Sequence, residues 1–238
     1  QLEIEQVTNY FASSISGQNT VDDMLWGVTK NCISKLGFED CVIYLANDDR
    51  KMLIQKSAWG PKTTEEKKII NPIKIPFGKG IVGSVALNNK AEIINDTSKD
   101  KRYIVDDVRR LSEVCVPVSN DGKLLGVIDS EHSQKNFYTE RHLQILTTIA
   151  SLVANRIVII KAEEIAKQKE IEVLKLKASN FQYQLEIEQV VNFFSSSISA
   201  QYSIDDMLWN ISKNLIGKLG FEDCMIYLWN EDKTLLMQ

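Results

Sequence analysis

Residues 1–55 of the chain recur as residues 184–238, at a constant offset of 183 and without a gap. The most similar blocks are Gln1–Val7 with Gln184–Val190, Asp22–Trp26 with Asp205–Trp209, and Lys35–Cys41 with Lys218–Cys224. Self-similarity at a fixed period indicates a duplicated structural module. The second copy stops at the counterpart of Gln55, so the sequence predicts a complete module followed by an incomplete second copy over residues 200–238.

The pattern of caps, turns and apolar residues in the first copy predicts an α+β module. An N-terminal helix is expected over residues 1–19, and Thr20 with Asp23 forms a capping box before a helix over 21–36. Strands are predicted over 38–45 and 52–59, followed by a short strand at 72–76, a short helix at 80–88 and a strand at 91–95. A final hairpin over 114–118 and 124–130 turns at Asn120-Asp121-Gly122 and completes six strands.

A single long helix is predicted after the hairpin, because the chain has neither glycine nor proline between Val127 and Ile216. The helix is expected over residues 139–199, and at 1.5 Å per residue it would be roughly 90 Å long, more than one domain can bury. Packing on its own domain accounts for residues 139–160 only. Further on, a 3-4 spacing typical of a parallel two-stranded coiled coil continues through Ile171, Leu174, Ala178, Phe181 and Leu185. We therefore expect a homodimer through this linker helix.

Composition limits the classes of function. Lys and Arg number 28 against 32 acids, and the net charge of −4 gives no indication of nucleic-acid binding. Apolar runs are too short for a membrane span and the N-terminus does not resemble a signal peptide, so a cytoplasmic location is expected. Four cysteines without metal-ligand spacing and two histidines predict no metal, no cofactor, no catalytic residue and no enzymatic activity.

Gly78-Lys79-Gly80-Ile81-Val82-Gly83 matches the G-x-G-x-x-G pattern of dinucleotide-binding proteins. No βαβ pattern surrounds the motif, and no acid closes a strand about 20 residues further on, as that fold requires. The alternative is that the glycines allow a tight turn and the close packing of a short helix.

The same run resembles the centre of a GAF domain when it is read with Ala91–Asp96 and Arg102-Tyr103. Val114–Val118, Gly122–Ser130 and Phe137–Glu140 are similar to that family's last two strands and the start of its closing helix. The resemblance covers about residues 20–155, with the domain itself at 20–138, and it starts again near residue 200. It implies a GAF/PAS-like fold, in which a six-stranded antiparallel sheet has flanking helices on one face and a small-molecule pocket on the other.

Position by position, the resemblance implies a ligand pocket lined by Val42, Tyr44, Trp59, Ile81, Val82, Asp96 and Tyr103. The alternative is that Val42, Ile81 and Val82 only fill the core and that Asp96 caps a turn. Residues 62–110 hold eleven Lys and Arg against seven acids, which favours an anionic ligand, although a solvated loop surface accounts for it equally well.

The resemblance implies a regulatory sensory module, such as the tandem GAF input region of a bacterial two-component sensor. A bound ligand, or dimer packing, would alter the long helix and so signal to a downstream output domain. Glu131-His132-Ser133 replaces the Asn-Lys pair of cyclic-nucleotide-binding members, and the chain has no Cys-His pair for a bilin. The alternative is a free methionine-(R)-sulfoxide reductase that uses Cys115, with Cys41 as a possible second thiol.

The truncated second copy is expected to leave apolar residues and a strand edge uncovered, because most of its sheet is missing. The residues concerned are Ile226, Leu228 and Trp229. We expect them to pair with another chain or to pack on the first module.

Overall fold

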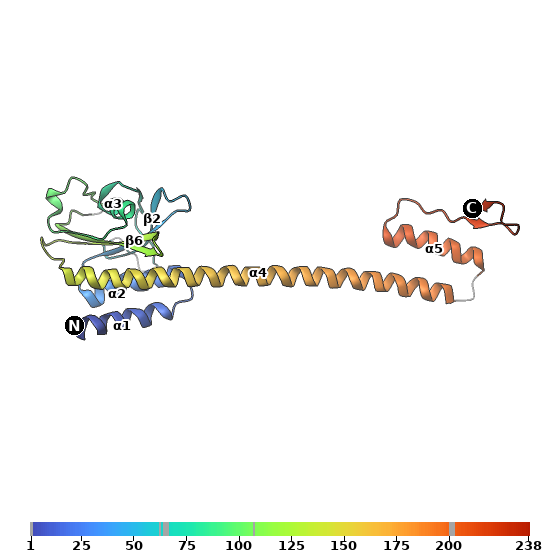
Figure 1. Ribbon diagram of the computed structural model, residues 1–238, viewed down its shortest axis with the longest axis horizontal. Coiled ribbons are helices and arrows are strands. Elements are labelled where there is room, and N and C mark those ends of the chain that lie inside the picture. The colour runs from blue at the N-terminus through green and yellow to red at the C-terminus, as the bar shows by residue number, and fades with distance from the viewer. Residues whose placement is uncertain (1, 62, 64–66, 107, 200–202) are drawn as a thin grey trace. The chain divides into compact units, whose positions relative to one another are not determined.

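The computed structural model describes residues 2–61, 63, 67–106, 108–199 and 203–238 (Figure 1). It divides into two compact units, residues 1–165 and 166–238. The elements are, in order, α1 (Leu2–Ser16), α2 (Val21–Leu36), β1 (Cys41–Ala46), β2 (Met52–Trp59), β3 (Lys74–Pro76), α3 (Gly80–Asn88), β4 (Glu92–Ile94), the 3-10 helix η1 (Thr97–Lys99), β5 (Ser112–Asn120), β6 (Lys123–His132), α4 (Glu140–Ser199), α5 (Ile204–Leu219), β7 (Leu228–Trp229) and β8 (Leu236–Met237).

Strands β1 to β6 form one antiparallel sheet in the order β3-β2-β1-β6-β5-β4. Each edge strand, β3 and β4, has only three residues, and short edges limit pairing with other chains. The predicted α+β fold, a six-stranded antiparallel sheet with flanking helices and a long helix after it, is confirmed.

The two faces of the sheet carry two separate cores. Helices α1, α2 and the first part of α4 cover one face, which we call the helical face, and α3 lies on the other, the α3 face (Figure 1). Leu25 and Ile149 pack with Ile43 of β1 on the helical face. Val42 and Tyr44 of the same strand pack on the α3 face, because successive side chains of a strand point in opposite directions.

A β-bulge in β2 changes which of its side chains reach each face. Ile43 pairs with Ser57 but the next residue, Tyr44, pairs with Gln55, so Lys56 is the extra residue. Gln55 therefore lies with Tyr44 on the α3 face, whereas Ser57 Oγ is 2.8 Å from Thr29 Oγ1 of α2 on the helical face. Simple alternation along β2 would place all odd-numbered residues on the same face, and the bulge is why it does not.

The glycine motif forms the turn into α3. Gly80 has a φ of 73°, in the left-handed region that favours glycine, and Gly78 N donates to Gly83 O at 2.7 Å. A Cβ on Gly83 would lie 2.4 Å from Pro76 O, so no side chain fits there. The close-packing interpretation of this motif is supported, and the antiparallel sheet around it is not a dinucleotide-binding fold.

Helix α4 has 60 residues, and its bounds agree with the prediction of 139–199 to within one residue. Leu146, Val153 and Ile160 are buried in the first unit. Beyond this point the helix has exposed apolar side chains, namely Ile165, Ile171, Val173, Leu174, Leu176, Phe181, Tyr183, Ile187 and Val191.

By length and composition alone, α4 contains a window apolar enough to cross a membrane. It lies within residues 140–193, has a mean hydropathy of 1.8, and is 44% buried inside the protein. Core helices meet the same criterion, so the window is weak evidence, and the expected absence of a membrane span stays a prediction.

The second unit repeats the start of the first. Lys218 Nζ lies 3.9 Å from the ring centroid of Phe193, near the end of α4, as Lys35 Nζ of α2 lies 4.8 Å from that of Tyr10 in α1. The end of α4 thus takes the place of α1 in the second copy. Leu228 and Trp229 are exposed, and the prediction that another surface covers them stays a prediction.

Candidate functional site

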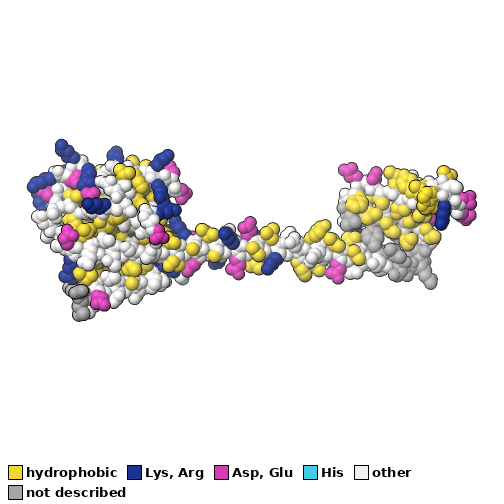
Figure 2. All heavy atoms as spheres, viewed as in Figure 1, with side chains coloured by type: hydrophobic (Ala, Val, Ile, Leu, Met, Phe, Trp, Pro, Cys, Tyr) yellow, Lys and Arg dark blue, Asp and Glu magenta, His cyan; other side chains and the backbone are white. Residues whose placement is uncertain are grey.

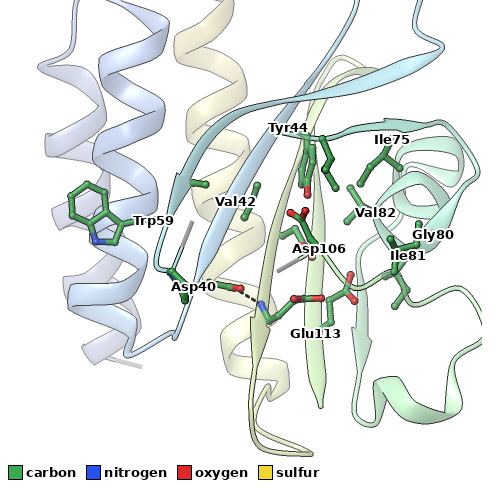
Figure 3. Close-up of a pocket in the computed structure, with 16 residues that line it drawn as sticks. Asp40, Val42, Tyr44, Trp59, Ile75, Gly80, Ile81, Val82, Asp106 and Glu113 are labelled. Atoms are coloured by element: carbon green, nitrogen blue, oxygen red, sulfur yellow. Dashed lines mark hydrogen bonds between the residues drawn. The ribbon is translucent and has the colours of Figure 1, made fainter. Parts of the chain in front are cut away.

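A small cavity of about 40 Å³ lies between the α3 face of the sheet and the segments that surround α3 (Figure 3). Strands β1, β2, β5 and β6 form its floor, and α3 and the segment before β5 form its sides. Its lining residues are Asp40, Val42, Tyr44, Ala58, Trp59, Pro61, Ile73, Ile75, Gly80, Ile81, Val82, Ile104, Asp106, Glu113, Asp129 and Glu131.

Acidic side chains on two paired strands make the floor acidic. Cys115 pairs with Asp129, and Glu113 pairs with Glu131 two residues away, so these four side chains are neighbours on the α3 face. Burial, and then the neighbouring carboxylates, raise the pKa of all three carboxyl groups above their ordinary values, and that of Glu131 rises to about 9. With this pKa, Glu131 holds a proton at neutral pH.

A further lining acid, Asp40, is held by a hydrogen bond and an ion pair. Asp40 Oδ1 accepts a hydrogen bond from Glu131 N at 2.7 Å (Figure 3). Arg110 Nη2 lies 3.9 Å from the other oxygen of Asp40, and its Nε lies 3.5 Å from Glu39 Oε2. Asp129 Oδ1 is buried without a hydrogen bond among the described residues, so a cationic ligand would satisfy it.

The first turn of α3 provides the opposite polarity. Lys79 is the N-cap residue, and its side chain makes no capping hydrogen bond. The first hydrogen bond of the helix is donated by Gly83 N to Lys79 O. The N–H groups of Gly80, Ile81 and Val82 have no acceptor within the helix, as at every helix start. All three residues line the cavity, so the N-terminal end of α3, which carries partial positive charge, borders it.

The predicted site residues divide into two groups. Val42, Tyr44, Ile81 and Val82 line the cavity with their side chains buried. Trp59 also lines it, but its indole ring points away from the other lining side chains (Figure 3), and Lys30 Nζ of α2 lies 5.4 Å from the ring centroid. The bulge in β2 explains this direction, which sequence alternation did not reveal.

Asp96 and Tyr103 are not among the lining residues. Asp96 caps η1 through Ser98 N and lies 2.8 Å from Lys135 Nζ, and these hydrogen bonds lower its pKa to about 2. The capping alternative is thus supported for Asp96. Tyr103 OH accepts from Arg110 N at 2.9 Å and hydrogen-bonds to Glu131, so it contacts the floor from outside the cavity.

Sequence reasoning missed the acidic residues of the site. Asp129 stands within a predicted strand, whereas Glu113 and Glu131 lie one residue outside the predicted bounds of the two hairpin strands. The observed strands include all three residues, and their register places them together. The excess of basic residues over 62–110 indicated instead either an anionic ligand or a solvated loop surface. None of the described lining residues is Lys, Arg or His, so the cavity itself favours a cation.

Cys115 lies beneath this floor and is fully buried without being one of the lining residues. Its sulfur lies within 4.8 Å of a carboxylate oxygen of both Glu113 and Asp129, and burial with these carboxylates raises the pKa of the thiol. We assign no metal to these three groups, because a hydrogen bond joins the two carboxyls. Cys41 faces the other side of the sheet, so the two thiols cannot pair.

The model of the GAF domain family matches residues 18–158. Over 78 residues the chain is 36% identical to Protein YtsP of Bacillus subtilis, and over 80 residues it is 36% identical to free methionine-R-sulfoxide reductase of Saccharomyces cerevisiae. Each match covers 33% of this chain, with 48% of the first protein and 44% of the second, so the chain spans about half the length of these relatives.

Among solved structures, the free methionine-R-sulfoxide reductase of Neisseria meningitidis in complex with its substrate has a TM-score of 0.61. The match has 19% identity and covers 67% of this chain and 91% of that one, which shows a shared fold. The prediction that this chain has no enzymatic activity is contradicted by these relatives, two of which are named as reductases. That prediction relied on the scarcity of histidines and paired cysteines, and acidic residues brought together by strand pairing were not considered.

Proposed function

Because the chain belongs to the GAF domain family, we propose that the domain at residues 18–158 binds a small zwitterionic amino acid in the acidic cavity and acts on it. Free methionine sulfoxide represents this class, as the names of two relatives suggest. The observation that carries the proposal is the opposite polarity of the two sides of one cavity, with carboxyl groups on the sheet and free N–H groups at the start of α3.

Each part of such a ligand has a partner of suitable chemistry. The ammonium group would lie against Glu131 and Asp129, where its charge offsets the repulsion between the buried carboxylates. The carboxylate would accept from the N–H groups of Ile81 and Val82, because helix starts bind anions. Val42, together with the other apolar lining residues, would contact the aliphatic part.

Cys115 is the candidate reducing group. Its sulfur would attack the sulfoxide sulfur and take the oxygen, Glu113 would donate a proton to that oxygen during the transfer, and the proton of the thiol would return to Glu113. The products are a thioether and a sulfenic acid on Cys115, which two equivalents of an external thiol reduce to the free thiol, a disulfide and water. Since Cys115 lies beneath the floor, the ligand must displace the Glu113 and Asp129 carboxyls to reach it.

Calorimetric titration with L-methionine sulfoxide tests the binding part. We expect the N-acetyl derivative, which lacks the ammonium group, to bind at least about tenfold more weakly, a difference of about 1.4 kcal/mol. Equal affinities for both compounds would contradict the zwitterion assignment. Glu131→Gln should reduce the difference between them, because it removes a carboxylate partner of the ammonium group.

A thiol-consumption assay with the R and S sulfoxides tests the chemical step. Cys115→Ser should abolish turnover, whereas Cys41→Ser and Cys224→Ser, at sites outside the cavity, should retain it. Binding without turnover in the wild-type protein would contradict the reductase proposal and would be consistent with the binding proposal.

A second candidate function is signal transmission through α4, which the apolar residues of this helix beyond residue 165 favour (Figure 2). Among them, Ile171, Leu174 and Phe181 belong with Ala178 and Leu185 to a stripe with the 3-4 spacing of a coiled-coil seam, so a homodimer would cover that stripe. In this role the tandem modules would form a cytoplasmic input region, as in bacterial two-component sensors. Ligand binding would shift the helix by a difference in affinity between two dimer arrangements.

Analytical ultracentrifugation of residues 1–238 tests this candidate. The wild-type protein should sediment as a dimer, and a variant with Leu174, Phe181 and Leu185 replaced by Glu should sediment as a monomer. Equal monomeric masses for both proteins would exclude the coiled coil.

A further inference from the structure

Gln55 of β2 joins three elements around the cavity without lining it. Its Nε2 donates to Tyr44 OH of β1 at 3.0 Å and to Asp106 Oδ2, in the segment before β5, at 2.8 Å. Its Oε1 accepts from Ile73 N, in the segment before β3, at 3.0 Å. All three partners line the cavity, whereas Gln55 does not.

The hydrogen bonds fix the orientation of the Gln55 amide. A backbone N–H such as that of Ile73 can only donate, so it must face Oε1, and Nε2 is then directed at Asp106 and Tyr44. The side chain is almost completely buried, so a partner lost here leaves an unsatisfied polar group. An amide, with two donors and an acceptor on one plane, fits this position where a carboxylate does not.

Asp106 is the lining acid that accepts a hydrogen bond from Gln55. Glu113, Asp129 and Glu131 are held by the backbone ladder of β5 and β6, but Asp106 lies in a segment outside any helix or strand. Arg102 anchors the start of this segment through Glu92 and Asp100, away from the cavity. At residue 106 itself, the side-chain amide of Gln55 donates a hydrogen bond from the sheet to the Asp106 carboxylate.

We propose that Gln55 is a positioning residue that holds the Asp106 carboxylate over the cavity, and so sets the affinity for the ammonium group of the ligand. The inference rests on the proposed function for the ligand, and the β2 bulge at Lys56 is the feature that aims Gln55 at this face. Gln55 acts through Asp106 and does not contact the ligand.

Three variants test the inference. Gln55→Glu places a carboxylate beside that of Asp106 and should weaken the binding of L-methionine sulfoxide about tenfold. Asp106→Asn keeps an acceptor for Gln55 and loses only the charge. Asp106→Asn should therefore also weaken binding. The double variant restores a hydrogen bond with donor and acceptor exchanged but lacks the carboxylate at residue 106, so it should bind no more tightly than Asp106→Asn. A structural role alone would lower the melting temperature of Gln55→Glu and leave the Kd unchanged, and that result would overturn the proposal.

Hydrogen exchange at the amides of residues 104–106 separates this inference from the proposed function. Gln55→Glu should increase exchange there and the double variant should reverse it, whether or not methionine sulfoxide binds. Unchanged exchange in Gln55→Glu would overturn the positioning role, whereas a wild-type protein that fails to bind the sulfoxide would overturn the proposed function. Gln182→Glu makes the same chemical change on the exposed part of α4, and it should alter neither measurement.

Discussion

The two copies of the repeated segment share their helix and turn, yet they bury the same residues to different extents. Helices α2 and α5 both have 16 residues and both end at a glycine in the left-handed region, with φ of 72° and 71°. Trp26 in the first copy is 7% exposed, whereas its counterpart Trp209 is 77% exposed. Helix bounds therefore follow from local sequence, and burial does not.

The first strand of each copy differs in length, although the turn that follows it is the same. The turn after the first strand is the same in both copies, with Asn47 N bonded to Met52 O and Asn230 N bonded to Leu235 O at 2.9 Å in each case. Strand β1 nevertheless has six residues, and β7 has two. In the first copy β6 pairs with the other edge of β1, and residues 203–238 contain no strand in that position. Strand length thus depends on the neighbouring strand.

The largest expected difference between the copies is in core substitutions. Leu25→Ala should destabilise the first unit by about 2–5 kcal/mol, because Leu25 is fully buried between α2 and the sheet. The counterpart Leu208→Ala, at a partly exposed site, should cost less than about 1 kcal/mol. Urea unfolding followed by hydrogen exchange of residues 114–132 and 204–219 measures the two effects. Similar losses at both sites would mean that the second copy is covered in solution.

A pH dependence of stability is expected in the first unit only. Glu131, with its pKa raised to about 9, keeps a proton in the folded state between about pH 4.5 and 9, whereas the unfolded chain has lost it. The free energy of unfolding should therefore fall as the pH rises through this range, by at most about 1.4 kcal/mol per pH unit from this group. Denaturant titrations at pH 6, 7 and 8 measure the slope.

Glu131→Gln is the control for this pH dependence, since glutamine keeps hydrogen-bonding groups and does not titrate. The slope should flatten in this variant. It should stay unchanged in Glu163→Gln, which makes the same change at an exposed site on α4. A slope of the opposite sign in the wild-type protein would mean that Glu131 is ionised in the folded state.

Most of the first unit could be predicted from sequence, because its signals are local. Thr20 with Asp23 marks the start of α2, Asp121 with Gly122 marks the last hairpin, and the structure has both. The strand expected over residues 38–45 begins only at Cys41, since the side chains of Glu39 and Asp40 bond instead to Ser133 and to the backbone of Glu131. Those partners are more than ninety residues away in the chain, and no local pattern reveals them.

The site was less predictable than the fold, because strand pairing and a bulge create it. Val42 and Tyr44 follow from alternation in β1, but the shift of register at Lys56 reverses the expected direction of Trp59. The acidic floor requires the register that sets Glu113 opposite Glu131. The sequence shows that acidic residues are present in these strands, but it does not show how close their side chains lie to one another.

The smallest expected effect is at the helix caps, and here the two copies should behave alike. Thr20 Oγ1 accepts from Asp23 N at 3.1 Å, and Ser203 Oγ accepts from Asp206 N at the same distance. Thr20→Ala and Ser203→Ala should each cost about 1 kcal/mol, because a cap acts within one turn of its own helix. Hydrogen exchange at the first amides of α2 and α5 measures this, with Thr20→Ser as the control that keeps the hydroxyl. If Thr20→Ala were several-fold more costly than Ser203→Ala, the contribution of the cap would depend on packing around α2. The stability that a cap provides would then not be set by local sequence alone.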